Sequence, residues 1–140
     1  MSSLQHVQKF IELVPHGRAL GIQLVSCDPA LGRCVLRQPW REELVGDPAT
    51  GILHGGVITA LLDTLAAACV LARGILPQAT LDLRIDYLRP ATPRIELVGD
   101  ASCYRVTRHV AFVRGVCHQG EPEHPVANLT ATFVLQENKS

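Results

Sequence analysis

The spacing of hydrophobic residues predicts a short amphipathic helix at the start of the chain. Apolar side chains recur there at steps of three and four positions, at Leu4, Val7, Ile11 and Val14. Proline lacks the backbone N–H that a helix interior needs, so we expect this helix to end at Pro15-His16-Gly17.

A second helix is predicted from Gly55 to about Arg73, and it is apolar on nearly every side. It is expected to stop at Gly74 and Pro77. At 1.5 Å per residue, its longest apolar stretch, residues 57–72, spans roughly 24 Å, less than the ~30 Å of a bilayer core. Asp63 also lies near its centre. We therefore predict a buried helix and not a membrane span.

Strand patterns occupy much of the rest of the chain. Six segments are predicted as strands, at residues 22–25, 33–37, 80–88, 95–104, 110–118 and 126–135. A turn around Asp28-Pro29 joins the first two, and residues 39–52 have little periodicity and are predicted to form a long loop. Strands and helices do not alternate, so the pattern favours an α+β fold with an antiparallel sheet of about six strands. We expect one domain over residues 1–140.

An apolar helix must be covered on all sides. One sheet can wrap part of the predicted helix, and a second subunit could cover the remainder, so we expect at least a dimer. The equal numbers of basic and acidic residues, 13 of each, permit such self-association.

The composition excludes some functions. A hydrophobic fraction of 47% supports a packed core, and the neutral charge balance offers no electrostatic basis for binding nucleic acid or an anionic membrane. With Phe 3, Tyr 2 and Trp 1, base-stacking surfaces are not expected either.

The cysteines indicate a reducing environment. They are odd in number and scattered without a CxxC pair, at Cys27, Cys34, Cys69, Cys103 and Cys117. No basic segment followed by an apolar one occurs at the N-terminus, so a signal peptide is not expected. We predict reduced, mostly buried thiols in a cytoplasmic protein.

Asp63 is the most informative candidate residue. It lies in mid-helix between leucines, and it is too far from Gly55 to cap the helix. An unpaired carboxylate is costly to bury, which indicates a paired, cleft-exposed or functional group. Two interpretations remain open: a catalytic acid, or a carboxylate that only accepts hydrogen bonds or pairs with an arginine.

His54-Gly55-Gly56 is the second candidate site. Glycines at a helix N-terminus expose backbone N–H groups where the helix dipole favours negative charge, and these groups could stabilise a thioester oxyanion. The alternative interpretation is that the glycines of this tripeptide only form a turn before the helix. Asp63 lies about 12 Å from Gly55 along one helix. The Asp63 of a two-fold partner is therefore better placed to act with Gly55 than the Asp63 of the same subunit.

The segment from Gly51 to Thr64, GILHGGVITALLDT, resembles the signature of PaaI-like acyl-CoA thioesterases of the hotdog fold. The similarity extends to DLRIDYLRPA from Asp82, TRHVAF from Thr107 and ANLTATF from Ala127, and it covers nearly the whole chain. It implies an antiparallel sheet wrapped around one long central helix, and hydrolysis of acyl-CoA to a free acid and CoA.

The resemblance also implies roles for particular residues. Asp63 corresponds to the family's carboxylate, which acts as nucleophile or as general base on water. Gly55 corresponds to the glycine whose backbone N–H polarises the thioester carbonyl, with His54 beside it. Thr80 corresponds to a Ser or Thr that helps to position the attacking water.

Asp47 marks a departure from the family pattern. Relatives often carry an Asn six or seven residues before the histidine, where this chain has Pro48 and Asp47. If Asp47 points into the site, two carboxylates share it; if it points outward, the water loses a partner.

The resemblance further implies contacts with CoA. The implied CoA-binding positions are Gly56, Gln78, Tyr87, Arg89, Pro90 and Arg108. An arginine suits a phosphate because its planar fork donates two hydrogen bonds, although each arginine could equally be a solvated surface charge. No metal or redox cofactor is implied, since CoA belongs to the substrate, and the expected assembly is a homodimer or a tetramer of two dimers.

Two alternatives to an acyl-CoA thioesterase remain. A hotdog protein that binds acyl-CoA without hydrolysing it would serve as a sensor or scaffold. The absence of the family's Asn from this chain is compatible with such a non-catalytic protein. A hotdog dehydratase or hydratase ranks third. That chemistry generally uses a catalytic histidine paired with an acid on the substrate-facing helix, and no histidine occurs between Gly55 and Gly74. The sequence does not define the acyl chain.

Overall fold

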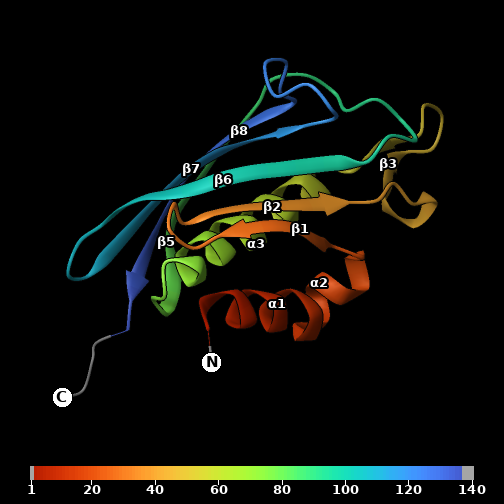
Figure 1. Cartoon of the computed structure of the whole chain (residues 1–140). Helices are drawn as coiled ribbons and strands as arrows, with labels where there is room; N and C mark the ends of the chain where they lie inside the picture. The colour runs from red at the N-terminus through yellow and green to blue at the C-terminus, as the bar shows by residue number, and fades with distance from the viewer. Residues whose placement is uncertain (1, 137–140) are drawn as a thin grey trace.

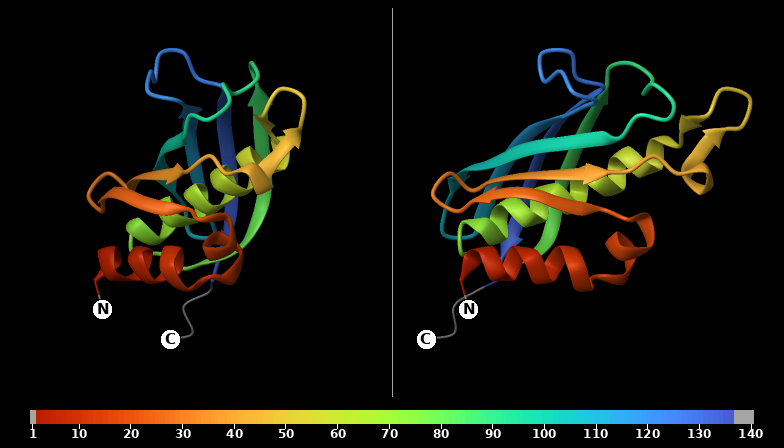
Figure 2. Two further views of the ribbon diagram at one scale, coloured as in Figure 1. Left: turned by 90° about the vertical axis from the view of Figure 1, so that its right-hand side faces the viewer. Right: turned by 45° about the vertical axis from the view of Figure 1, so that its right-hand side comes forward.

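The apolar segment after His54 forms α3 (Gly55–Ala72), around which the rest of the chain is wrapped. The computed structural model describes residues 2–136 and shows a curved antiparallel sheet with α3 lying in its concave face (Figures 1 and 2). This is the predicted arrangement of sheet and central helix, the hotdog architecture.

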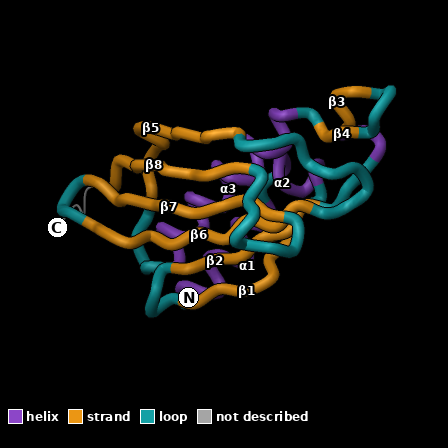
Figure 3. The backbone as a smooth tube through the Cα atoms, turned by 90° about the horizontal axis from the view of Figure 1, so that it is seen from above, coloured by secondary structure: helices purple, strands orange, loops and turns teal. Residues whose placement is uncertain are grey.

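Six strands make up the main sheet. In chain order they are β1 (Gln23–Asp28), β2 (Arg33–Gln38), β5 (Pro77–Tyr87), β6 (Leu97–Val106), β7 (Val110–His118) and β8 (Ala127–Leu135). Their spatial order is β1-β2-β6-β7-β8-β5, with every neighbouring pair antiparallel, as Figure 3 shows from above. The edges of the sheet are therefore β1 on one side and β5 on the other.

The N-terminal region holds two helices where one was predicted. α1 (Ser3–Leu13) ends as expected, and Val14 is extended. A second helix, α2 (Pro15–Leu20), then begins at the proline itself. Proline is well suited to the first position of a helix, where its missing N–H would have no partner, so the residue that ends α1 also starts α2.

The predicted loop over residues 39–52 contains short elements. A 3₁₀ turn, η1 (Glu42–Leu44), leads into a small hairpin of β3 (Val45–Asp47) and β4 (Ile52–Leu53). The hairpin projects beyond the main sheet at the end where α3 begins (Figures 1 and 2). A Cβ atom at Gly46 would lie 2.8 Å from His54 Cα, so glycine is needed for this close approach.

The core lies between α3 and the sheet. Leu61, Leu62 and Leu65 have no solvent exposure and face the inner sides of the strands. β6 crosses α3 at Gly99, where a Cβ atom would lie only 2.8 Å from Leu65 Cδ2. By length and composition α3 could cross a membrane, but 56% of it is buried inside the fold, as in the core helix of a folded domain.

One face of α3 is left partly uncovered. Gly56 is exposed, and Thr59, Asp63 and Ala67 are partly exposed. Spacings of three and four residues place them on one side of the helix. Thr59 and Asp63 therefore lie on a stripe of this otherwise apolar helix that residues 2–136 leave partly uncovered.

Candidate active site

Asp63 and Thr80 meet where α3 faces β5. The Thr80 hydroxyl donates a hydrogen bond to Asp63 Oδ1 over 3.1 Å. The register of β5 against β8 is irregular on both sides of Thr80, between Pro77 and Ala79 and between Thr80 and Asp82. Bulges of this kind redirect side chains, and here they accompany the threonine that points at the carboxylate. The partly exposed Asp63 is thus oriented and accessible.

His54 and the two glycines form the N-terminus of α3. His54 is the N-cap, and its Nδ1 accepts the Gly56 N–H over 2.9 Å. This bond places the neutral ring's proton on Nε2. The Gly56 N–H is thereby occupied, and the Val57 N–H bonds to the His54 carbonyl. Gly55 is the first helical residue, so its N–H has no partner within the helix, and among residues 2–136 it is the N–H at this helix end that is left for an incoming oxyanion.

Two hydroxyl groups hold the first turn of α3 against the end of β5. The hydroxyls of Thr59 and Tyr87 are hydrogen-bonded to each other, and the one that accepts in this bond donates its own proton to the Gly55 carbonyl, which lies 3.3 Å from Thr59 Oγ1 and 3.4 Å from Tyr87 Oη. Thr59 was not identified from the sequence. Its position four residues after Gly55, in an otherwise apolar run, is the signal that could have identified it.

Asp47 lies in the β3–β4 hairpin and caps its own turn. Its Oδ1 accepts the Ala49 N–H over 3.1 Å, and its Oδ2 accepts the Thr50 hydroxyl over 2.9 Å. The side chain is exposed. This is a local turn that Asp commonly makes with the residues after it. In the single protomer, both carboxylate oxygens are therefore engaged within the hairpin.

The predicted CoA contacts fall into two groups in one protomer. Tyr87, Arg89 and Pro90 lie at the end of β5 beside the start of α3, and Arg89 donates to the His124 carbonyl over 2.7 Å. Gln78 lies at the other end of β5, where Arg108 lines a cavity of about 330 Å³ below the end of α3. At ~3.3 Å per residue, Gln78 and Tyr87 are roughly 30 Å apart. One protomer does not bring the two groups together.

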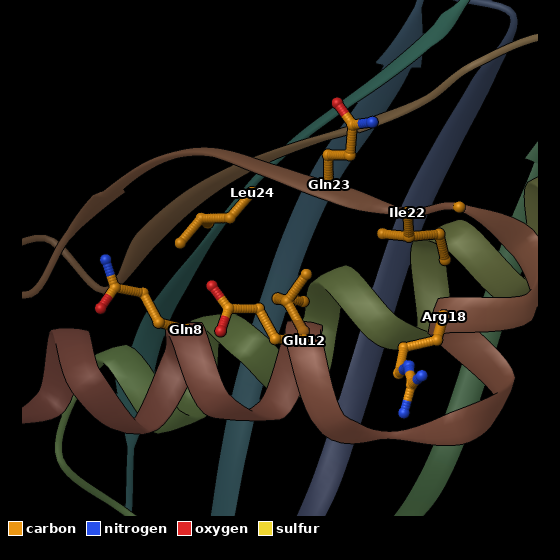
Figure 4. Close-up of a pocket in the computed structure, with 8 residues that line it drawn as sticks. Gln8, Glu12, Arg18, Ile22, Gln23 and Leu24 are labelled. Carbon is orange, nitrogen blue, oxygen red and sulfur yellow. The ribbon is translucent and has the colours of Figure 1, made fainter.

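A larger cavity of about 510 Å³ lies between α1 and the edge strand β1. Gln8 and Glu12 rise from α1 toward Gln23 and Leu24 (Figure 4). It shares no lining residue with the Asp63 or Gly55 sites. Among residues 2–136, no group of three His, Cys, Asp or Glu side chains is placed to hold a metal ion.

Comparison with known proteins identifies the class of fold and site. Residues 50–126 match the family model of the thioesterase superfamily. The medium/long-chain acyl-CoA thioesterase YigI of Salmonella typhimurium is 32% identical, over 91% of this chain and 90% of its own.

Solved structures agree with the sequence comparison. A Pseudomonas aeruginosa protein is 36% identical with a TM-score of 0.81, covering 94% of this chain and 98% of its own. A mutant of the phenylacetic acid degradation protein PaaI from Thermus thermophilus is 28% identical with a TM-score of 0.75. The match covers 86% of this chain and 98% of the PaaI chain. The chain belongs to the thioesterase superfamily, and it is a thioester hydrolase.

Proposed function

We propose that this protein hydrolyses acyl-CoA to a free carboxylic acid and CoA, with Asp63 as the catalytic carboxylate. The observation that carries the proposal is the Thr80–Asp63 hydrogen bond on the uncovered face of α3. It holds an accessible carboxylate in one orientation on an otherwise apolar helix. The activity named for the YigI relatives supports acyl-CoA as the substrate, with a medium or long acyl chain.

The complete site is formed by two protomers. Gly55 and Asp63 are separated by about 12 Å along α3, too far for one thioester carbonyl to meet both. Within residues 2–136, β5 has a strand neighbour on one side only, and its Leu81 is 60% exposed. A long unpaired edge strand is a template for pairing with another chain. A two-fold partner paired along β5 runs its α3 in the opposite direction and brings its Gly55 end toward Asp63.

In this homodimer, each group has a defined part in the reaction. Asp63 removes a proton from water, and the water oxygen attacks the thioester carbonyl carbon; alternatively, the Asp63 carboxylate attacks that carbon itself and water then hydrolyses the anhydride. The Gly55 N–H and the α3 dipole stabilise the negative charge on the carbonyl oxygen. Collapse of the intermediate expels the CoA thiolate. Thr80 keeps Asp63 directed at the reacting water or carbon.

The dimer also joins the two groups of CoA contacts. Antiparallel pairing of β5 places the Gln78 end of one strand near the Tyr87 end of the other. Arg89 from one protomer and Arg108 from its partner then flank one substrate, and each guanidinium can donate two hydrogen bonds to a phosphate. Two dimers make the expected tetramer. A cytoplasmic location stays a prediction from the cysteines and the N-terminal sequence.

A panel of acyl-CoAs with acyl chains of increasing length tests the function. Release of free CoA is followed by reaction with a chromogenic disulfide, for the parent protein and for Asp63→Asn in parallel. We expect hydrolysis by the parent, and binding with hydrolysis at least about 10²-fold slower by the variant. A parent protein that binds acyl-CoA and hydrolyses none of the panel would instead be a non-catalytic acyl-CoA-binding protein, a sensor or a scaffold.

A further inference from the structure

Three cysteine thiols are neighbours where β1 and β2 face α3: those of Cys27 in β1, Cys34 in β2 and Cys69 in α3. Cys27 and Cys34 are direct partners in the antiparallel register of β1 and β2. Direct partners point to the same face of a sheet. The Cys34 thiol lies between those of Cys27 and Cys69, and the Cys69 thiol together with burial raises the pKa of Cys34. The site identified above uses none of these residues.

The backbone geometry permits a bond between the first two thiols. Cα atoms of directly opposed residues in an antiparallel pair are about 4.5 or 5.5 Å apart, and a disulfide requires about 4.4–6.8 Å. In the part of the chain that the structure describes, β1 has a strand neighbour on one side only, and its register is irregular between Leu24 and Ser26. An edge strand with a bulge can make the small adjustment in Cβ separation that a disulfide needs.

Accessibility and hydrogen bonding select Cys27 over Cys69 as the partner of Cys34. Cys69 is fully buried, and its Sγ donates to the Ala101 carbonyl over 3.2 Å. Cys27 is partly exposed at the edge of the sheet, where a small oxidant can reach it. The first attack must therefore occur at Cys27, and Cys34 is the thiol placed to complete the reaction.

We propose that Cys27 and Cys34 are a modification site, at which a low-molecular-weight disulfide such as oxidised glutathione forms an intramolecular disulfide. The Cys27 thiolate attacks one glutathione sulfur and releases one reduced glutathione. The Cys34 thiolate then attacks the Cys27 sulfur of this mixed disulfide and releases the second. The two protein thiols lose two protons and two electrons, and the glutathione disulfide gains them.

The bond forms slowly at neutral pH, and it does not involve β5, the edge strand that carries Thr80. Burial and the adjacent Cys34 raise the pKa of Cys27 to about 12, and the pKa of Cys34 is raised as well, so the reactive thiolate of each residue is scarce. β1 and β5 are opposite edges of the sheet, so the bond is remote from Thr80. Closing the β1–β2 hairpin restricts the unfolded chain, and the oxidised protein should melt about 5 °C higher than the reduced one.

Tryptic mapping after oxidation tests the proposal, because each cysteine falls in a different tryptic peptide. Cys27 lies in residues 19–33, Cys34 in 34–37 and Cys69 in 42–73. The folded protein is incubated overnight with oxidised glutathione at about pH 8.5, near the pKa of an ordinary thiol. It is then acid-quenched, alkylated and digested. We expect a mass loss of about 2 Da and a cross-link between peptides 19–33 and 34–37, both reversed by dithiothreitol.

Three variants separate this outcome from others. Cys117→Ala removes a buried thiol that has no part in the proposal and should keep the cross-link. Cys27→Ser and Cys34→Val should each abolish both the cross-link and the rise in melting temperature. A cross-link between peptides 34–37 and 42–73, glutathione retained on Cys27, or a parent protein that stays fully reduced would each overturn the proposal.

Discussion

The Thr80 hydroxyl donates to the Asp63 carboxylate over 3.1 Å, joining the free edge strand of the sheet to the middle of the central helix. The strand that positions the proposed catalytic acid is therefore also the strand on which we expect a second protomer to pair. Assembly and catalysis therefore share one structural element.

Replacement of Asp63 by asparagine tests the catalytic acid. Asp63→Asn keeps the volume and can still accept the Thr80 hydrogen bond, but it removes the basic oxygen. We expect kcat to fall by at least about 10²-fold, the low end for loss of a general base, while acyl-CoA binding and the dimer persist. Steady-state kinetics and light scattering give these values. A kcat within a few-fold of the parent would exclude Asp63 from the chemistry.

Thr80 is expected to act through Asp63. Thr80→Val preserves shape and removes the hydroxyl, so the carboxylate loses its orientation and kcat should fall about tenfold with little change in KM. Thr80→Ser retains a donor at the same position and should stay near the parent value. Equal losses in the Val and Ser variants would point to packing at this position and not to the hydrogen bond.

The exposed leucine on β5 tests the dimer. We expect Leu81→Lys to place a charge in the inter-subunit strand pair, to shift the protein toward monomer at micromolar concentration, and to reduce activity in parallel. Leu31→Lys is the matched control, because Leu31 is 59% exposed against 60% for Leu81 and lies in the turn of the opposite edge. Sedimentation should show the control unchanged. A fully active monomer would contradict the two-protomer site.

Asp47→Asn tests whether this residue takes part in the site. If Asp47 faced Asp63, the change would relieve repulsion between two carboxylates and move the acidic limb of the rate profile lower. The carboxylate instead caps the β3–β4 turn, and asparagine can accept the same Ala49 N–H. We therefore expect kcat and its pH profile to stay within about twofold of the parent. A shifted acidic limb would place Asp47 in the site of the dimer.

The buried thiols predict the direction of stability at alkaline pH. Burial raises the pKa of Cys117 to about 12, whereas the pKa of a cysteine thiol in the unfolded chain is about 8.5. Between these values the folded state binds more protons than the unfolded state, so the free energy of unfolding falls as pH rises. Each such cysteine contributes about 1 kcal/mol per pH unit. Urea titrations under reducing conditions at about pH 8 and 10 should show a smaller loss for Cys117→Ala.

Much of the fold follows from local patterns. The continuous apolar run after Gly55-Gly56 could only be a covered helix, and the strand segments after it could only pair in an antiparallel sheet, since no helices alternate with them. The helix boundaries follow from glycine and proline. What the pattern misjudged were short elements: α2 begins at the proline that ends α1, and residues 39–52 contain a hairpin held by its own turn contacts.

Some features of the site also follow from the local sequence, and others depend on the tertiary structure. The sequence by itself determined that a carboxylate lies in an apolar helix and that two glycines open that helix, because both depend on neighbours a few residues away. Only the tertiary structure decided that Thr80 meets Asp63 and that the Thr59 and Tyr87 hydroxyls meet beside the Gly55 carbonyl. These contacts depend on the strand register and its bulges, which are set by packing between distant segments. No local pattern of residues encodes them.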